Sequence, residues 1–339
     1  MKKFVIVTPE FGLCKGGIQS WAYYIKASLE HSKSFEGSVI SYREAKFLDW
    51  FGFLQSWFTR KSYILMTWKM SIFVLPLLVI NCLFNKDRFV IMVHGNEILN
   101  LNIFQKKFVQ FLSYSKRVHF ICNSHSVKDL FSKKVGVNKT TVVYPFVDFP
   151  DEYELGNVRS TNEKLNLVTT TRLVGRKNIS SVLEALKILK ERGVDFSYNI
   201  CGSGPEFNNL VKLTHVLGID SEVFFHGVVD EATKWKMIEQ SDLFLLPSIF
   251  DKKNGSIEGY GIVYIEANSV GTPVLSGNTG GAVEAVLNGI TGIHTDGSEK
   301  QIAEAIYLFD KHSFSKSKLR QHAEKHHYKN QEKFLSFFK

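Results

Sequence analysis

Two glutamates, Glu258 and Glu266, stand eight positions apart in a glycine-containing segment, EGYGIVYIEANSV. Gly259 and Gly261 permit close approach of a ligand to the backbone. The apolar periodicity that follows predicts a helix, whose free N–H groups and dipole favour a phosphate at its start. If most of the interval is helical, the two carboxylates lie up to ~12 Å apart. That span roughly matches the distance from a sugar hydroxyl to a ribose.

This spacing argues against hydrolysis by paired carboxylates. Retaining glycosidases hold their two carboxyl groups only ~5 Å apart, and inverting ones hold them under ~10 Å apart. We therefore interpret Glu258 and Glu266 as hydrogen-bonding anchors rather than as an acid and a nucleophile. The structural alternative is that Glu258 caps the helix and Glu266 faces solvent.

Three basic residues follow strand-like runs. Arg172 ends NLVTTTR, and Lys177 stands at the mouth of the next helix, whose start Asn178 can cap. A guanidinium and an ammonium at the carboxyl end of a parallel strand suit a diphosphate; two solvated surface charges are the alternative. His94 ends the buried-looking run RFVIMVHG, with Glu97 nearby to orient it or to face an acceptor. A lone histidine is more often structural.

Glycine loops follow two further strand-like runs. Gly16 and Gly17 come after FVIVT, and Gly202 and Gly204 lie in CGSGPE, where a tight turn is the alternative reading. Neither loop completes the G-x-G-x-x-G pattern, and no acidic ribose ligand follows at ~20 residues, which argues against a nicotinamide dehydrogenase.

The alternation of strand-like and helical runs predicts an α/β fold of parallel sheets flanked by helices. A chain of 339 residues exceeds the ~250 to 300 at which one core stops growing, so two domains are expected. Strands are predicted near 4–8, 38–42, 63–68, 88–94, 118–122 and 141–144, and then at NLVTTTR, FSYNICG, VFFHG, DLFLLPS and PVLSG. The polar, aperiodic stretch 145–165 is predicted to be the linker.

These motifs together resemble the retaining glycosyltransferases of family 4, which have the GT-B architecture. The order runs from the GG loop through HG, R-x4-K, PS and E-x7-E to G-x-P-V, GG-x-x-E and G-x-x-G, and the last third is the specific part. The resemblance implies two Rossmann-like doubly wound domains with a cleft between them. It implies an acceptor domain at 1–155, a nucleotide-sugar domain at 160–315, and a C-terminal helix, 316–339, that packs back on the first domain.

The resemblance also implies residue roles. Arg172 and Lys177 would stabilise the departing diphosphate, His94 would approach the donor sugar, and Glu258 would hold its hydroxyls. The donor would otherwise be bound by Gly16, Gly17, Gly202, Gly204, Gly259, Tyr260, Gly261, Ile262, Val263 and Glu266, the last of these on the ribose. The segment HGVVDEA, 226–232, resembles the base-reading loop of the family.

The expected reaction moves a hexosyl unit, with retention, from a nucleoside diphosphate sugar to a hydroxyl of a glycan or lipid-linked oligosaccharide in cell-surface polysaccharide assembly. A UDP-sugar is favoured, and GDP-mannose is the alternative donor. No D-x-D triplet is present, which suits a family that needs no cofactor and no metal ion. A catalytically silent GT-B scaffold in a polysaccharide assembly complex is the alternative function.

Composition indicates the cellular compartment and the kind of partner. Four scattered cysteines, without C-x-x-C spacing, argue against a disulfide framework or a zinc site and favour a cytoplasmic protein. The net charge of +9 implies an anionic partner, which is membrane lipid, a diphosphate-bearing acceptor or nucleic acid. Nucleic acid is the weakest of these, because no nucleic-acid-binding motif accompanies the charge. Aromatic and basic helices at 47–58 and 104–117 suit peripheral binding to the inner face of the cytoplasmic membrane, or internal packing.

The apolar stretch 63–84 is read as strand, helix and strand rather than as a membrane span. The paired His322 and His326 are read as part of the C-terminal helix rather than as a metal site.

Overall fold

The computed structural model describes residues 2–8, 11–12, 17–41, 62–67, 88–149, 164–331 and 334–335. The chain forms two compact units. The first comprises Met1–Asp148 and His326–Lys339, and the second comprises Phe149–Lys325. The boundary between Asp148 and Phe149 falls inside the predicted linker, most of which lies outside the described residues.

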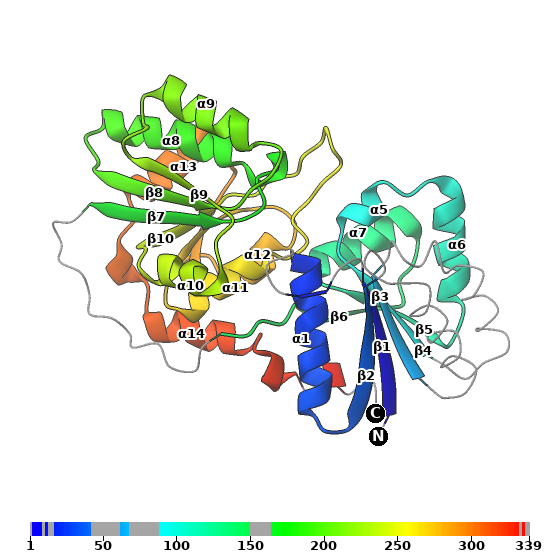
Figure 1. Ribbon diagram of the computed structural model, residues 1–339. Helices are drawn as coiled ribbons and strands as arrows, with labels where there is room; N and C mark the ends of the chain where they lie inside the picture. Colours follow the sequence, from blue (N-terminus) through cyan, green and yellow to red (C-terminus); the bar gives the residue numbers. More distant parts are fainter. Residues whose placement is uncertain are drawn as a thin grey trace. The chain divides into compact units, whose positions relative to one another are not determined.

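The first unit is built on a parallel sheet with the order β2-β1-β3-β4-β5-β6. Its strands are β1 (Lys2–Thr8), β2 (Phe35–Ser41), β3 (Ser62–Thr67), β4 (Arg88–Val93), β5 (Val118–Cys122) and β6 (Thr140–Val142). Its helices are α1 (Gly17–His31), α5 (Asn96–Leu99), α6 (Ile103–Ser113), α7 (His125–Val135) and the short 3-10 turn η3 (Tyr328–Asn330). In Figure 1, α1 packs along β1 and β2, and α6 and α7 pack on β5.

The sequence of the first unit explains these elements. β4 reads as an apolar run, and every residue from Phe89 to Val93 is buried, as a central parallel strand requires. α6 begins with a capping box, because the side chain of Asn102 accepts from the N–H of Gln105 at 2.9 Å and the side chain of Gln105 accepts from that of Asn102 at 3.0 Å. α7 begins at Ser124, whose hydroxyl accepts from the N–H of Val127.

The second unit has a parallel sheet with the order β12-β11-β10-β7-β8-β9. Its strands are β7 (Leu165–Thr170), β8 (Phe196–Cys201), β9 (Val223–Gly227), β10 (Leu243–Leu246), β11 (Val274–Gly277) and β12 (Gly292–Thr295). Its helical elements are η1 (Gly175–Lys177), α8 (Ile179–Glu191), α9 (Phe207–Leu217), α10 (Glu231–Glu239), α11 (Ile262–Ser269), α12 (Ala282–Ala285), α13 (Glu299–Tyr307), η2 (Lys311–Ser313) and α14 (Lys316–Glu324). Figure 1 shows α8, α9 and α13 on one face of the sheet and α10 and α11 on the other.

Both sheets are doubly wound, so the predicted fold class is confirmed in each unit. In the second unit the strand order reverses between β7 and β10, which lie side by side although β8 and β9 come between them in the chain. Such a switch point leaves space outside the carboxyl ends of the strands, where open α/β sheets bind ligands. β12 was not predicted, because its four residues, GIHT, carry no apolar run.

The predicted C-terminal segment, 316–339, is divided between the two units, and its α-helix α14 covers Lys316–Glu324. α14 belongs to the second unit and packs on α11. The segment from His326 onward belongs to the first unit, where the N–H of Val147 donates to the carbonyl of His326 at 2.9 Å. Phe334 of the same segment packs on Phe146.

Two of the segments considered for membrane contact lie largely outside the described residues. The predicted helix 47–58, and the stretch 63–84 beyond Thr67, lie outside the described residues. Within the ranges that the structure describes, no helix is long and apolar enough to cross a membrane.

Candidate active site

Most of the predicted site residues gather in the second unit, beyond the carboxyl ends of β7 and β10. η1, which carries Lys177, follows β7. Ser248 follows β10, and Glu258 precedes α11. These segments therefore meet at the switch point of the sheet, where the strand order creates a ligand-binding position.

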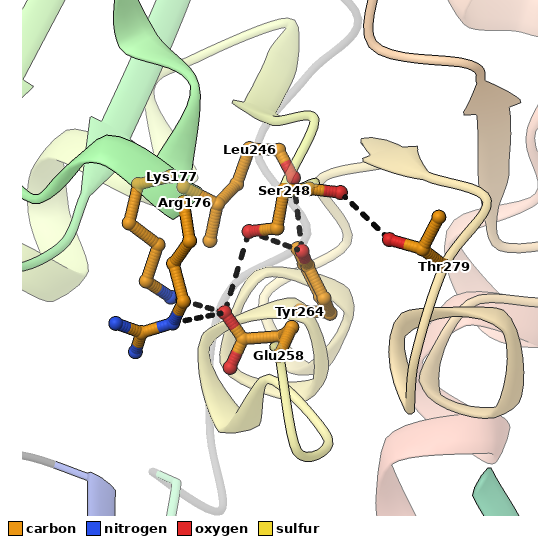
Figure 2. A network of polar contacts seen from close by, with 7 residues as sticks. All are labelled: Arg176, Lys177, Leu246, Ser248, Glu258, Tyr264 and Thr279. Carbon is orange, nitrogen blue, oxygen red and sulfur yellow. Dashed lines mark hydrogen bonds and ion pairs between the residues drawn. The ribbon is translucent and has the colours of Figure 1, made fainter. Parts of the chain in front are cut away.

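Lys177 and Glu258 form a buried ion pair at this position (Figure 2). The Lys177 ammonium Nζ lies 2.5 Å from Oε2 of Glu258, and the hydroxyl of Ser248 donates to the same oxygen at 3.3 Å. Burial lowers the pKa of Lys177, although the carboxylate beside it opposes the shift. Burial acts to raise the pKa of Glu258, but the charges of Lys177 and Arg176 outweigh it and hold that pKa below its ordinary value. The carboxylate is therefore ionised at neutral pH.

Arg176 is a second cation beside Glu258, and it is not among the residues predicted from the motifs. Its Nε lies 4.0 Å from Oε2 of Glu258, and Figure 2 shows the guanidinium beside the carboxylate. Nε is buried and has no hydrogen-bond partner among the described residues. In the sequence, Arg176 is the first basic residue of the GRK run. An arginine with an unsatisfied nitrogen is suited to an anionic ligand.

Two further side chains, which the sequence analysis did not single out, form hydrogen bonds around Ser248. The hydroxyl of Tyr264 donates to the carbonyl of Leu246 at 2.9 Å and lies 3.4 Å from the Ser248 hydroxyl. The hydroxyl of Thr279 donates to the Ser248 carbonyl at 3.3 Å. Burial raises the pKa of Tyr264, so its hydroxyl stays a neutral donor. Together these bonds fix the serine that contacts Glu258 (Figure 2).

Arg172 lies just beyond β7 with an exposed side chain, unlike Lys177. Within the described parts of the chain, no ion pair or hydrogen bond of its guanidinium is recorded. The sequence predicted Arg172 and Lys177 as equivalent diphosphate ligands. In the structure Arg172 is exposed, whereas Lys177 is buried against Glu258.

Asn178 does not cap α8 as expected. It occupies the N-cap position in the left-handed region, at φ 60°, and its side chain makes no capping bond. Instead the amide donates to the carbonyls of Gly297 at 2.7 Å and Pro247 at 3.3 Å. The residue thus ties η1 to the segments that follow β12 and β10.

The predicted glycines allow loops of the second unit to pack backbone to backbone. A side chain on Gly202 or Gly204 would collide with the carbonyls of Thr171 and Leu173 respectively, on either side of Arg172. The N–H groups of Thr171 and Leu173 donate to the carbonyls of Cys201 and Ser203, at 2.9 Å each. Gly202 and Gly204 are therefore required to hold the loop of Arg172, whatever they contribute to a ligand.

The segment from Gly259 to Val263 presents backbone groups at the start of α11. Gly261 is in the left-handed region, at φ 91°, and caps the helix without a side chain. The N–H of Tyr264 donates to the carbonyl of Gly261, but in the described parts of the chain no partner is recorded for those of Ile262 and Val263. Such free amides can bind a phosphate. The side chain of Tyr260 is buried, so only its backbone is available.

Glu266 lies on α11, buried to 6% exposure. Its Oε1 accepts from the ammonium of Lys234, on α10, at 3.2 Å. Only the second half of the interval between Glu258 and Glu266 is helical, because α11 begins at Ile262. Asp230 in the HGVVDEA segment caps α10, accepting from the N–H of Thr233 at 2.7 Å.

Three predicted site residues belong to the first unit. His94 follows β4 and is 9% exposed, with its ring edge-on to Trp21. Burial lowers the pKa of His94 to about 3, so the imidazole is neutral at pH 7. Its backbone N–H donates to Glu97 at 2.5 Å. Gly17 is the first residue of α1, and Gly16 lies outside the described residues.

No group of three or more histidine, cysteine, aspartate or glutamate side chains is arranged to hold a metal ion within the described ranges. His322, read as part of a helix, is buried, and its Nε2 lies 3.0 Å from the carbonyl of Ala285. His326, four positions later, belongs to the other unit.

The fold of the chain is the GT-B fold. Sucrose-phosphate synthase from Thermosynechococcus elongatus matches with a TM-score of 0.76 at 14% identity over 99% of both chains. HepE from Anabaena, solved with UDP-glucose, matches with a TM-score of 0.73 at 17% identity, again over 99% of both chains. These likenesses establish the fold.

The sequence itself matches the family model of the glycosyl transferases group 1 over residues 156–330, just over half of the chain. The chain belongs to this family. A GDP-mannose-dependent alpha-(1-6)-phosphatidylinositol monomannoside mannosyltransferase of Mycobacterium tuberculosis is 35% identical over 147 residues, which are 42% of this chain and 38% of that one. The putative colanic acid biosynthesis glycosyltransferase WcaL of Escherichia coli is 33% identical over 129 residues, 38% of this chain and 32% of WcaL. The chain thus spans well under half the length of the curated relatives it matches.

Proposed function

We propose that this protein is a retaining, metal-independent hexosyltransferase that uses a nucleoside diphosphate sugar in the assembly of a cell-surface polysaccharide. The observation that carries the proposal is the contact of Arg176 and Lys177 with Glu258, at the switch point of a group 1 glycosyltransferase domain. Two cations there, with the exposed Arg172 of the preceding loop, suit a departing diphosphate, and a carboxylate suits the hydroxyls of the sugar that leaves it.

The chemistry of Glu258 supports a binding role rather than a nucleophilic one. Its Oε2 is contacted by the cations Lys177 and Arg176 and accepts a hydrogen bond from Ser248, and these interactions lower its basicity. No contact of Oε1 is recorded for the described residues, which leaves that oxygen for a sugar hydroxyl. Without a nucleophilic carboxylate, retention requires attack from the face of the leaving group, where a phosphate oxygen takes the proton of the acceptor hydroxyl.

The donor is proposed to be a UDP-sugar, with GDP-mannose as the alternative. A structural neighbour was solved with UDP-glucose, whereas the mycobacterial relative is GDP-mannose-dependent. Metal independence rests on the positive charge of Arg172, Arg176 and Lys177, which supplies the electrostatic role that a divalent ion has elsewhere.

The test is a thermal-shift screen of UDP- and GDP-sugars, followed by an assay of donor hydrolysis with and without EDTA. We expect one nucleotide class to raise the melting temperature and hydrolysis to survive EDTA. A nucleotide that binds without any turnover, with every acceptor tried, would favour the alternative of a catalytically silent scaffold. Loss of hydrolysis in EDTA would refute metal independence alone.

The acceptor is proposed to be a glycan or lipid-linked oligosaccharide at an anionic membrane surface. We propose that this surface is the inner face of the cytoplasmic membrane and that α6 contacts it. Phe104, Phe111 and Tyr114 are 80%, 59% and 85% exposed and recur at helical spacing. Lys107 is exposed on the same stripe. The opposite side of α6 buries Val109 and Leu112 in the core of the first unit. Exposed aromatics beside lysine suit the headgroup layer of anionic lipid.

A further inference from the structure

Lys234 connects two acidic residues of the second unit. Its ammonium lies 2.7 Å from Oε2 of Glu231, on the same helix, and 3.2 Å from Oε1 of Glu266, on α11. Glu231 belongs to the HGVVDEA segment, and Glu266 is the carboxylate predicted to bind ribose. One lysine thus joins the segment predicted to read the base to the residue predicted to bind the sugar of the nucleoside.

This bridge is unlike the other lysine–glutamate pairs on the surface of the unit. The side chains of Lys234 and Glu266 are 15% and 8% exposed, whereas those of Lys187 and Glu191 are 39% and 62% exposed. Exposed pairs contribute little, but a buried carboxylate needs a countercharge. Burial acts to lower the pKa of Lys234, yet the two carboxylates outweigh it and raise that pKa, so the ammonium is charged.

The helices on either side of the bridge are fixed to each other. The buried hydroxyl of Thr272, just beyond α11, donates to the carbonyl of Ile238, in α10, at 2.8 Å. Lys234 also lies 4.7 Å above the ring of Trp235, which restricts its side chain further. The ammonium is therefore held in place, and so is the carboxylate that it contacts.

The bridge uses only one of the two oxygens of Glu266. Lys234 contacts Oε1, and in the described parts of the chain no contact of Oε2 is recorded. A carboxylate with one oxygen held by a cation and the other open can accept from a ligand hydroxyl in a defined direction.

We propose that Lys234 is a positioning residue for nucleotide binding, which holds Glu266 in the orientation that accepts from the ribose hydroxyls and couples it to the base-reading segment through Glu231. This inference rests on the proposed function, since it takes the ligand to be a nucleoside diphosphate. Lys234 acts through Glu266 and not by its own contact with the ligand.

The experiment compares the affinities of the full chain for UDP and GDP with those for their 2′,3′-dideoxy forms, by calorimetry. For the wild type we expect removal of the hydroxyls to weaken binding about tenfold to a hundredfold, the usual range for hydrogen bonds to a charged group. The substitution Lys234→Met should weaken binding of the ribonucleotide by a similar factor. The same variant should bind the dideoxy form with the affinity of the wild type. Lys234→Arg should restore the preference for the hydroxyls. Lys236→Met, an exposed lysine of the same helix, is the matched control and should change nothing.

A second comparison stays valid even if Lys234→Met does not fold. In the Glu266→Gln background, which removes the buried charge, adding Lys234→Met should leave the affinity for the ribonucleotide unchanged. A further loss there would show that Lys234 contacts the ligand itself and would overturn the proposal. So would a Lys234→Met protein that still prefers the hydroxyls, or a wild type that binds both forms equally. A wild type that binds neither UDP nor GDP would instead overturn the proposed function.

Discussion

The ammonium of Lys177 lies 2.5 Å from the carboxylate of Glu258, across a separation of 81 positions in the chain. The two residues were predicted to bind different parts of a donor, the diphosphate and the sugar. In the structure they neutralise each other in a buried position. A substitution of either residue therefore changes the charge of the site and the stability of the unit at the same time.

Lys177→Met is expected to destabilise the second unit by about 3 to 5 kcal/mol, because it leaves the buried carboxylate of Glu258 without its closest cation. Urea unfolding measures the change. The double variant Lys177→Met, Glu258→Gln should recover part of the loss. Lys187→Met, which breaks the exposed pair with Glu191, is the control and should cost less than about 1 kcal/mol. Equal effects at Lys177 and Lys187 would contradict the importance of burial.

Arg172→Ala is expected to lower kcat by about a hundredfold to a thousandfold, the range seen when one preorganised donor to a developing charge is lost. The melting temperature should not change, because the side chain is exposed and makes no recorded contact in the described parts of the chain. Arg192→Ala, an exposed arginine paired with Glu304, provides the matched control and should keep full turnover. Near-wild-type kcat in Arg172→Ala would refute the assignment of this residue.

The burial of His94 predicts a dependence of stability on pH. The pKa of His94 in the folded protein is about 3, below its ordinary value of 6.5. Between these values the unfolded chain binds a proton that the folded chain does not, so the stabilisation is complete above pH 6.5 and is lost as the pH falls toward 3.

His94→Gln removes this titration. In urea unfolding of the first unit, the free energy of unfolding of the variant should fall less steeply with decreasing pH than that of the wild type. The difference should approach about 1.4 kcal/mol per pH unit. Parallel curves for the two proteins would show that the folded state tolerates a charged His94.

The aromatic stripe of α6 predicts binding to lipid vesicles. The variant Phe104→Ser, Phe111→Ser should sediment with anionic vesicles at least tenfold less than the wild type at low salt, since it removes most of the apolar area available for insertion. Val216→Ser, an apolar residue of the second unit that is 82% exposed, is the matched control. If the wild type itself does not sediment, the membrane contact is wrong.

Local patterns in the sequence predict most of the strands and helices. Runs such as RFVIMV and LFLL are buried parallel strands, and their apolar character is visible without the structure. The strand order could not be predicted in this way, since it depends on pairings such as β7 with β10 between residues far apart in the chain. The short strand β12 was missed because its residues carry no such pattern.

The site was predicted in part for the same reason. Glu258, Glu266 and Lys177 stand in motifs, so their types and spacing identified them. Arg176 and Lys234 stand in no motif, and their importance comes from partners that only the folded chain brings near. The sequence also gave no sign that Arg172 would be exposed and Lys177 buried, because both simply follow one strand.

The return of the chain at His326 has a consequence for biosynthesis. Val147 and Phe146 of the first unit are covered by the segment that contains His326 and Phe334, which the ribosome makes only after the whole second unit. Domains usually fold in the order of their synthesis, N-terminal first. Here the unit that begins first is completed last, and until then Phe146 lacks part of its cover. The nascent first unit is therefore expected to need protection from aggregation for as long as the second is being translated.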